Sequence, residues 1–342
     1  MSTVRRLHDV LLHLDGLVPD RLLPVCRELL AAGRTAELAG AVVQATLESS
    51  AALSDADRDA LAEALAGVAD PVNVRAELDG IDAGLVPAYR FAAGRISVDV
   101  SGGPIAFDSD SEQMDDLDAT AVVALREIAA DLVGLWGTWR STDPPLGPPR
   151  RIYLVETVPD LADGALVAIA PRIQAALSAT GEASPQVAVL PGGSPPDAYH
   201  RAALGNAALL WAAAAPSTVE LARVYDRVDS ETGPTFDADH PRIPRNTVVH
   251  QRLLDYLDQG EPLVLTTTLL TDVVDPTLGE AVPINFRTDG RWIWPDAVAY
   301  YLNVHELAPD PELFAHARAA DFLVPHVDGV RLHRAMAVLL GA

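Results

Sequence analysis

The chain has 342 residues and a formal net charge of −23, with 49% hydrophobic and 21% charged residues. This length allows about two domains of ~150 residues each, and the apolar content predicts a packed core instead of a disordered chain. Nucleic acids and anionic membranes bind proteins that neutralise their negative charge, so the acidic balance argues against both as the main ligand. A basic protein partner is compatible with this charge, and an acidic surface that only keeps the chain in solution is the alternative.

Two amino-acid types limit the chemistry. All 25 residues of the Lys and Arg count are arginine. This removes pyridoxal-phosphate Schiff bases, Walker-A loops and protein-kinase sites, because each requires a lysine. Cys26 is the single cysteine, so no intrachain disulfide can form and a reducing cytoplasm is the expected location. No apolar run reaches the ~18 residues needed to cross a bilayer, and no cofactor is expected.

Residues 1–69 predict a helical module of four short helices. The first helix has one stripe of apolar residues at helical spacing, formed by Leu7, Val10, Leu11 and Leu14. Ser54 followed three residues later by Asp57 predicts a capped helix start. A helix-turn-helix DNA-binding module has a similar outline, but the acidic charge disfavours it.

Residues 70–140 predict a small strand-plus-helix region, with a strand at 95–100 and a helix at 119–139. Residues 141–149 (STDPPLGPP) contain four prolines. Proline denies a segment both helix and ladder hydrogen bonds, which predicts a linker between domains.

Residues 150–342 predict an α/β domain with a C-terminal β-meander. Strands expected at 151–157 and 186–190 flank a helix, and this order favours a parallel pair. Residues 207–215 (AALLWAAAA) fit either a strand or a buried helix.

The most explicit local pattern runs from 262 to 302. Residues 263–270 (LVLTTTLL) and 281–287 predict two strands, and 291–294 predicts a third. Asp289 and Gly290 predict a two-residue hairpin turn, and a helix should follow at Pro295. The expected fold class is therefore α+β, with a helical N-terminal module followed by a mixed α/β region that ends in a three-stranded meander plus helices.

Alternation along the hairpin sorts its side chains onto two faces. With a two-residue turn, Arg287 lies opposite Trp292 and Asn285 lies opposite Trp294, so these four side chains share one face. Tryptophan and arginine are enriched in binding hot spots, which predicts a binding surface. Packing of this face beneath a helix of the same chain is the alternative.

A second constellation consists of Asp237, Asp239 and His240, with His250 ten residues further on. Carboxylates and imidazoles in one loop can bind a divalent metal. These four residues would be catalytic in a metal-dependent hydrolase. A loop in which the carboxylates pair with nearby arginines is the other interpretation, and under it no metal site is present.

The run FRTDGRWIWPDAVAYYL, residues 286–302, resembles a segment of uncharacterised bacterial proteins. Some of these are thought to be immunity or accessory factors of toxin and secretion systems, including toxin–antitoxin pairs. The resemblance implies an immunity or accessory role. Together with the acidic charge and the single cysteine, it gives the main hypothesis, a non-enzymatic cytoplasmic protein-binding factor that masks a basic partner. The metal-dependent hydrolase and a scaffold held by the helical module are the alternatives.

Overall fold

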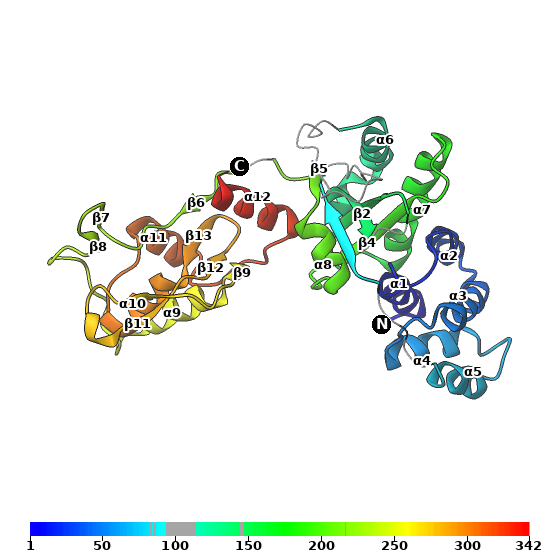
Figure 1. Cartoon of the computed structure of the whole chain (residues 1–342), viewed down its shortest axis with the longest axis horizontal. Helices are drawn as coiled ribbons and strands as arrows, with labels where there is room; N and C mark the ends of the chain where they lie inside the picture. The colour runs from blue at the N-terminus through cyan, green and yellow to red at the C-terminus, as the bar shows by residue number, and fades with distance from the viewer. Residues whose placement is uncertain (82–83, 85–86, 94–113, 144–146, 216, 342) are drawn as a thin grey trace. The chain divides into compact units, whose positions relative to one another are not determined.

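The computed structural model describes residues 1–81, 84, 87–93, 114–143, 147–215 and 217–341. These residues form two compact units, Met1–Ala214 and Ala215–Ala342, each with hydrophobic clusters of its own. Helices precede the sheet strands in the chain, and the expected α+β class is confirmed (Figure 1). Within the described ranges, no helix combines the length and apolar content required to cross a bilayer.

The N-terminal module consists of helices α1 (Thr3–His13), α2 (Leu22–Ala31), α3 (Thr35–Ser49), α4 (Asp55–Ala64) and α5 (Pro71–Asp79). The four predicted helices are present, and α5 follows them. The predicted stripe of α1 is buried, with Leu7, Val10, Leu11 and Leu14 each at most 1% exposed. The predicted capping box is also confirmed, since Ser54 Oγ accepts from Asp57 N at 3.2 Å and Asp57 Oδ2 accepts from Ser54 N at 3.0 Å.

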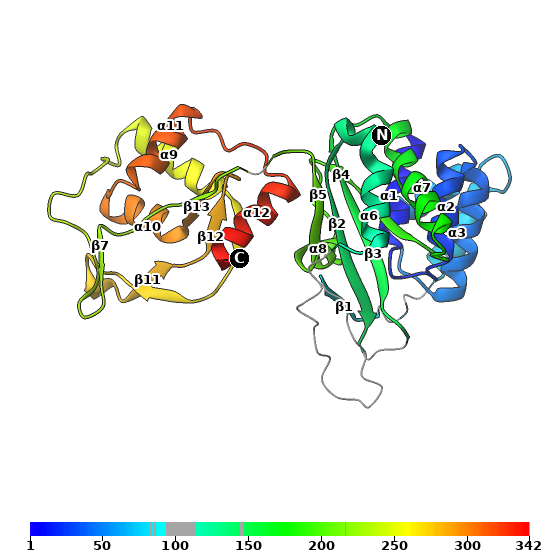
Figure 2. The same ribbon diagram turned by 90° about the horizontal axis from the view of Figure 1, so that it is seen from above.

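A five-stranded sheet follows, formed by β1 (Tyr89–Ala92), β2 (Leu132–Thr142), β3 (Arg150–Pro159), β4 (Gln186–Gly192) and β5 (Ala208–Ala212). Strands β3 and β4 pair in parallel, as predicted, and α7 (Asp163–Ala179) connects them. Strands β1 and β5 pair with different parts of β2, so the segment 207–215 contains a strand. Helices α6 (Asp116–Leu125) and α7 pack on one side of the sheet, and α8 (Ala198–Gly205) lies on the other (Figure 2).

The prediction of a helix over residues 119–139 is wrong for its second half. Helix α6 ends at Leu125, a 3₁₀ helix spans Arg126–Asp131, and β2 begins at Leu132. Local periodicity missed this change because β2 is stabilised by pairing with distant strands on both of its edges. The strand predicted at 95–100 lies outside the described residues.

The division of the chain also differs from the predicted one. Of residues 141–149, the first two belong to β2 and the rest connect it to β3, the adjacent antiparallel strand of the same sheet. Residues 144–146 lie outside the described residues. The boundary between the two units falls after Ala214 instead. Proline density marks a segment without ladder hydrogen bonds, and a hairpin connection meets that description as well as a linker does.

The second unit contains a four-stranded sheet of order β6–β13–β12–β9, formed by Glu220–Leu221, Trp292–Pro295, Phe286–Thr288 and Glu261–Val264. Two further antiparallel pairs join β10 (Leu269–Thr271) to β11 (Glu280–Pro283) and β7 (Arg227–Asp229) to β8 (Gly233–Thr235). Its helices are α9 (Val248–Gln259), α10 (Asp296–His305), α11 (Pro311–Ala319) and α12 (Gly329–Leu340), with a 3₁₀ turn at Pro276–Leu278.

The predicted meander is present with two changes. Each of its first two strands is interrupted, because Asn285 Oδ1 accepts the amide of Thr266 at 2.7 Å where ladder pairing would otherwise continue. The Asp289–Gly290 turn is two residues longer than predicted, since Arg287 lies opposite Trp294. A register shift of two residues keeps every side chain on its predicted face.

Candidate interaction surface

The four residues of the proposed hydrolase site do not gather around one point. Asp237 forms an ion pair with Arg227 at 2.9 Å, and Asp239 is exposed. His240 Nδ1 lies 2.8 Å from Asp226, whereas His250 is buried with Nε2 3.1 Å from the Leu302 carbonyl. Among the residues that the structure describes, no three His, Cys, Asp or Glu side chains converge as metal ligands.

The tryptophans of the predicted hairpin binding face lie in the hydrophobic core. Trp294 is fully buried, stacks on Tyr256 with ring centroids 5.5 Å apart, and donates from Nε1 to the Leu257 carbonyl at 3.1 Å. Trp292 is 6% exposed and packs in the same cluster, with its ring centroid 6.4 Å from that of His316. The expected exposed binding face is therefore covered by α9 and α11 of its own unit.

The polar residues of that face, Arg287 and Asn285, form hydrogen bonds within the same unit. Arg287 Nε donates to Asp296 at 2.7 Å, and its Nη1 donates to the carbonyl oxygens of Asp258 and Gly260. Asn285 Nδ2 donates to the same Asp296 carboxylate at 2.7 Å. The four residues share a face as predicted, but the face serves packing because α9 supplies the apolar surface that the tryptophans require.

We expect Trp292→Ala to lower the free energy of unfolding by ~3–5 kcal/mol, because truncation of a buried indole leaves a cavity. Chemical denaturation of the full chain measures this loss. Val228→Ala, at a side chain that is 78% exposed in the same unit, is the control and should change stability by less than ~0.5 kcal/mol. Equal stability of the two variants would contradict the burial of Trp292.

A buried carboxylate, Asp272, has partners that sequence patterns did not indicate. It accepts hydrogen bonds from Tyr300 Oη at 2.8 Å, from His305 Nε2 at 2.6 Å and from the amides of Val274 and Asp275. Burial alone would raise the pKa of Asp272, but these hydrogen bonds outweigh burial and lower it. The tyrosine and histidine lie 28 and 33 positions away in the chain, so no local motif signals the cluster.

Asp289 at the hairpin turn repeats this arrangement. Its buried carboxylate accepts from Tyr256 Oη and His316 Nε2, both at 2.6 Å, and from the amides of Arg291 and Trp292. Burial would raise the pKa of Asp289, and the hydrogen bonds again lower it. Each of the two carboxylates accepts hydrogen bonds from backbone amides of its own turn and from side chains on helices. These contacts give both carboxylates a structural role.

The first unit contains a charged cluster of four residues, of which Asp15, Arg27 and His200 are buried and Asp197 is partly exposed. Arg27 Nη2 donates to both Asp15 oxygens at 2.9 and 2.7 Å. His200 is fully buried, with Nε2 3.0 Å from Asp15 and Nδ1 2.8 Å from Asp197. Carboxylates only accept, so both bonds require the doubly protonated ring. Burial alone would lower the pKa of His200, but the two carboxylates raise it to about 9.

A second group of polar contacts extends this cluster to the sheet. Arg140 of β2 donates to Asp20 at 2.5 Å and to Tyr199 Oη at 3.0 Å, and Tyr89 Oη donates to the Gly16 carbonyl at 2.6 Å. Gly16 has φ +80°, and a Cβ there would lie 2.7 Å from the Tyr199 ring. These contacts join the connection between α1 and α2 to α8 and the sheet, so they position the helical module.

We expect the stability of the chain to fall as pH rises from about 6.5 to about 9, the unfolded and folded pKa values of His200. Because the folded chain raises this pKa, protonation of His200 contributes its full stabilisation below pH ~6.5. This contribution decreases as pH rises and is lost above the folded pKa of about 9. Urea denaturation across this range measures the decline. His200→Gln should remove this component and lower stability at pH 6 by ~3–5 kcal/mol, because Asp15 loses a buried partner.

His326→Gln is the control, since His326 is exposed. This variant should retain the decline of the parent chain above pH ~6.5. A parent curve that is flat between these pH values would show that His200 is neutral in the folded chain.

A shallow groove lies on the surface of α2 and α3, with a volume of about 510 Å³. It is lined by Pro19, Arg21, Leu22, Val25, Gly40, Ala41, Gln44, Ala45 and Glu48. Sites of catalysis usually combine a pocket with several converging titratable groups. This groove is mostly apolar, so it resembles a contact surface more than a reaction site.

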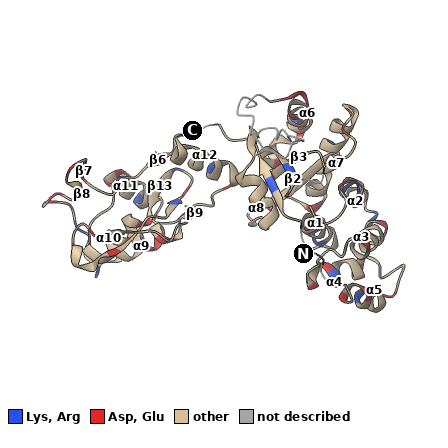
Figure 3. Ribbon diagram, viewed as in Figure 1, with Lys and Arg blue, Asp and Glu red and all other residues tan. Residues whose placement is uncertain are grey.

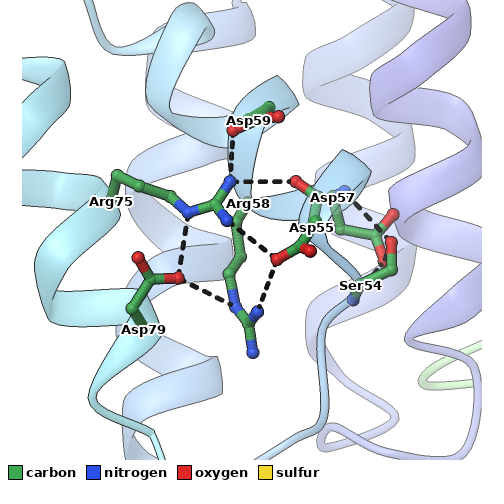
Figure 4. Close-up of polar contacts among 7 residues, drawn as sticks. All are labelled: Ser54, Asp55, Asp57, Arg58, Asp59, Arg75 and Asp79. Atoms are coloured by element: carbon green, nitrogen blue, oxygen red, sulfur yellow. Dashed lines mark hydrogen bonds and ion pairs between the residues drawn. The ribbon is translucent and has the colours of Figure 1, made fainter.

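Helices α4 and α5 carry an exposed group of carboxylates, Asp55, Asp59 and Asp79, which we call the α4–α5 acidic surface (Figures 3 and 4). Arg75 lies between them: it donates from Nη2 to Asp55 at 2.8 Å and from Nε to Asp79 at 2.9 Å, and its Nη1 donates to Asp59. Arg58 also pairs with Asp55, at 3.1 Å. Two guanidinium groups thus hold three carboxylates in a fixed arrangement.

The surroundings of this surface remain acidic and accessible. The side chains of Asp55 and Asp59 are 81% and 67% exposed despite their ion pairs. Residues 54–80 contain seven acidic residues and two arginines. Val68, between the two helices, and Val72, in the first turn of α5, are 75% and 73% exposed. Exposed apolar side chains with polar groups around them fit the apolar centre and polar rim of a protein contact.

Comparison of the chain with protein-family models, with curated proteins and with solved structures finds no match.

Proposed function

We propose that this protein is a cytoplasmic protein-binding factor, without enzymatic activity, that masks a basic partner through the α4–α5 acidic surface. The observation that carries the proposal is the set of carboxylates that stay exposed on α4 and α5 while Arg58 and Arg75 hold them in place. Ordered side chains lose less conformational entropy on binding than free ones. A positively charged surface is their natural complement.

The remaining parts of the proposal rest on the composition of the chain. Its net charge of −23 favours rapid encounter with a basic protein and repels nucleic acid and anionic lipid. The immunity or accessory role rests on the resemblance of residues 286–302 to bacterial proteins of that kind. The cytoplasmic location rests on a single cysteine, Cys26, which is buried and whose pKa burial raises to about 11.

The test begins with capture of a partner by the immobilised full chain from a lysate of the cells that make it. Binding of the purified partner is then measured by titration. The partner should carry a net positive charge, and its affinity should fall as salt is added. The variant Asp55→Asn with Asp59→Asn should bind roughly 5- to 30-fold more weakly, since each exposed charge contributes modestly.

A matched control removes the same number of charges elsewhere. Glu127 and Asp321 are 80% and 76% exposed and each pairs with an arginine, as Asp55 and Asp59 do. Glu127→Gln with Asp321→Asn should leave binding within about twofold of the parent chain. Equal losses in both variants, or affinity that salt does not change, would exclude the α4–α5 acidic surface as the binding site.

A further inference from the structure

The second unit has an open strand edge. Strand β9 pairs with β12, and β10 pairs with β11, so residues 261–271 run antiparallel to residues 280–288 as one interrupted ribbon. Among the strands that the structure describes, β9 is the last of its sheet and β10 has one partner. The outer edge of this ribbon therefore presents backbone groups that have no strand beside them.

The side chains along this edge are apolar and exposed. Val264, Leu265, Leu269 and Leu270 are 36%, 69%, 43% and 44% exposed. Residues 262–271 (PLVLTTTLLT) contain no charged residue, although the chain as a whole is 21% charged. Natural edge strands usually carry charges or other features that prevent pairing with another strand. This edge lacks charges over ten residues.

The order of residues along the edge is nearly symmetric about Thr267. Counting outwards from it, Thr266 matches Thr268, Leu265 matches Leu269, and Val264 matches Leu270. An antiparallel pair of identical strands that is centred on one residue places such matched positions opposite each other. Two copies of this edge would therefore place apolar residues opposite apolar ones and threonine opposite threonine, which are favourable cross-strand pairs.

We propose that two copies of this chain associate through the 261–271 edge, as an antiparallel strand pair with its twofold axis at Thr267. Strand β9 of one copy would pair with β10 of the other. Residues 265–268, which connect these two strands and in which Thr268 N donates to Thr266 Oγ1 at 3.1 Å, would lie at the centre and extend on pairing. Each copy carries a net charge of −23, so copies repel each other wherever their acidic surfaces meet. Residues 262–271 carry no charge, so this part of the edge is where they can approach closely. This surface is distinct from the α4–α5 acidic surface, so the proposal goes beyond the proposed function.

Sedimentation of the full chain over a range of concentrations tests the association. We expect a species of twice the 36.2 kDa chain mass that dissociates on dilution. Leu265→Arg should raise the dissociation constant about tenfold or more, because it places a charge in the strand pair. Leu323→Arg is the control, since both leucines are 69% exposed in the same unit, and it should leave the constant within about twofold.

A charge-swap variant tests the register. In the proposed pair, position 265 of one copy lies opposite position 269 of the other. Leu265→Arg combined with Leu269→Asp should therefore recover most of the association lost in Leu265→Arg, because the introduced charges are opposite and adjacent across the strands. Circular dichroism of Leu265→Arg should match the parent chain, so that its loss of association reflects the introduced charge.

Three results would overturn the proposal. A chain that remains monomeric up to about 100 µM has no such association, and the edge would then be open to an extended segment of another protein. A dimer that Leu265→Arg leaves unchanged uses another surface. A dimer in which Leu269→Asp fails to rescue Leu265→Arg does not have this register. Each outcome is independent of whether a basic partner binds the α4–α5 acidic surface.

Discussion

The need to satisfy buried charge is the constraint on which both units depend. A carboxylate or an imidazolium removed from water must find opposite charge and hydrogen bonds within the fold. In the first unit, Asp15 meets this need through Arg27 of α2 and His200 of α8. In the second unit, Asp272 and Asp289 meet it through backbone amides, a tyrosine and a histidine. Both units are therefore held by polar clusters as well as by apolar cores.

The same constraint separates structural carboxylates from those available to a partner. Helix α4 shows the difference within five residues. Asp57 is buried and bound to Ser54 and to His13, the latter at 2.8 Å. Asp55 and Asp59, two positions to either side, point outwards because two residues correspond to more than half a helical turn. The position of a carboxylate on its helix thus decides whether it supports the fold or remains at the surface.

The two candidate contact surfaces differ in chemistry, and they favour different partners. The α4–α5 acidic surface offers ordered charge, which complements a basic protein. The 261–271 edge offers uncharged backbone and aliphatic side chains, which complement another strand. Salt weakens the first kind of contact and affects the second little. A chain with both could bind a basic protein while it forms pairs of copies.

The sequence by itself determined the features that depend on neighbouring residues. The stripe of α1, the capping box at Ser54, the order of β3, α7 and β4, and the two faces of the hairpin at Asp289 follow from spacing, capping and alternation. Each of these signals acts within a few residues along the chain. They were sufficient for the α+β class and for the placement of most helices.

Only the tertiary structure decided the features that depend on distant residues. Segment 132–142 became a strand because the following strand β3 and the distant strand β5 pair with it. The Trp292 face became core because α9 and α11 cover it. His200 meets Asp15 across 185 positions, and no sequence pattern spans that separation. The residues of the proposed hydrolase site lie close in sequence, yet Asp237, His240 and His250 each bond to a different partner. Proximity along a chain fixes local geometry, whereas side-chain chemistry depends on what the folded chain brings alongside.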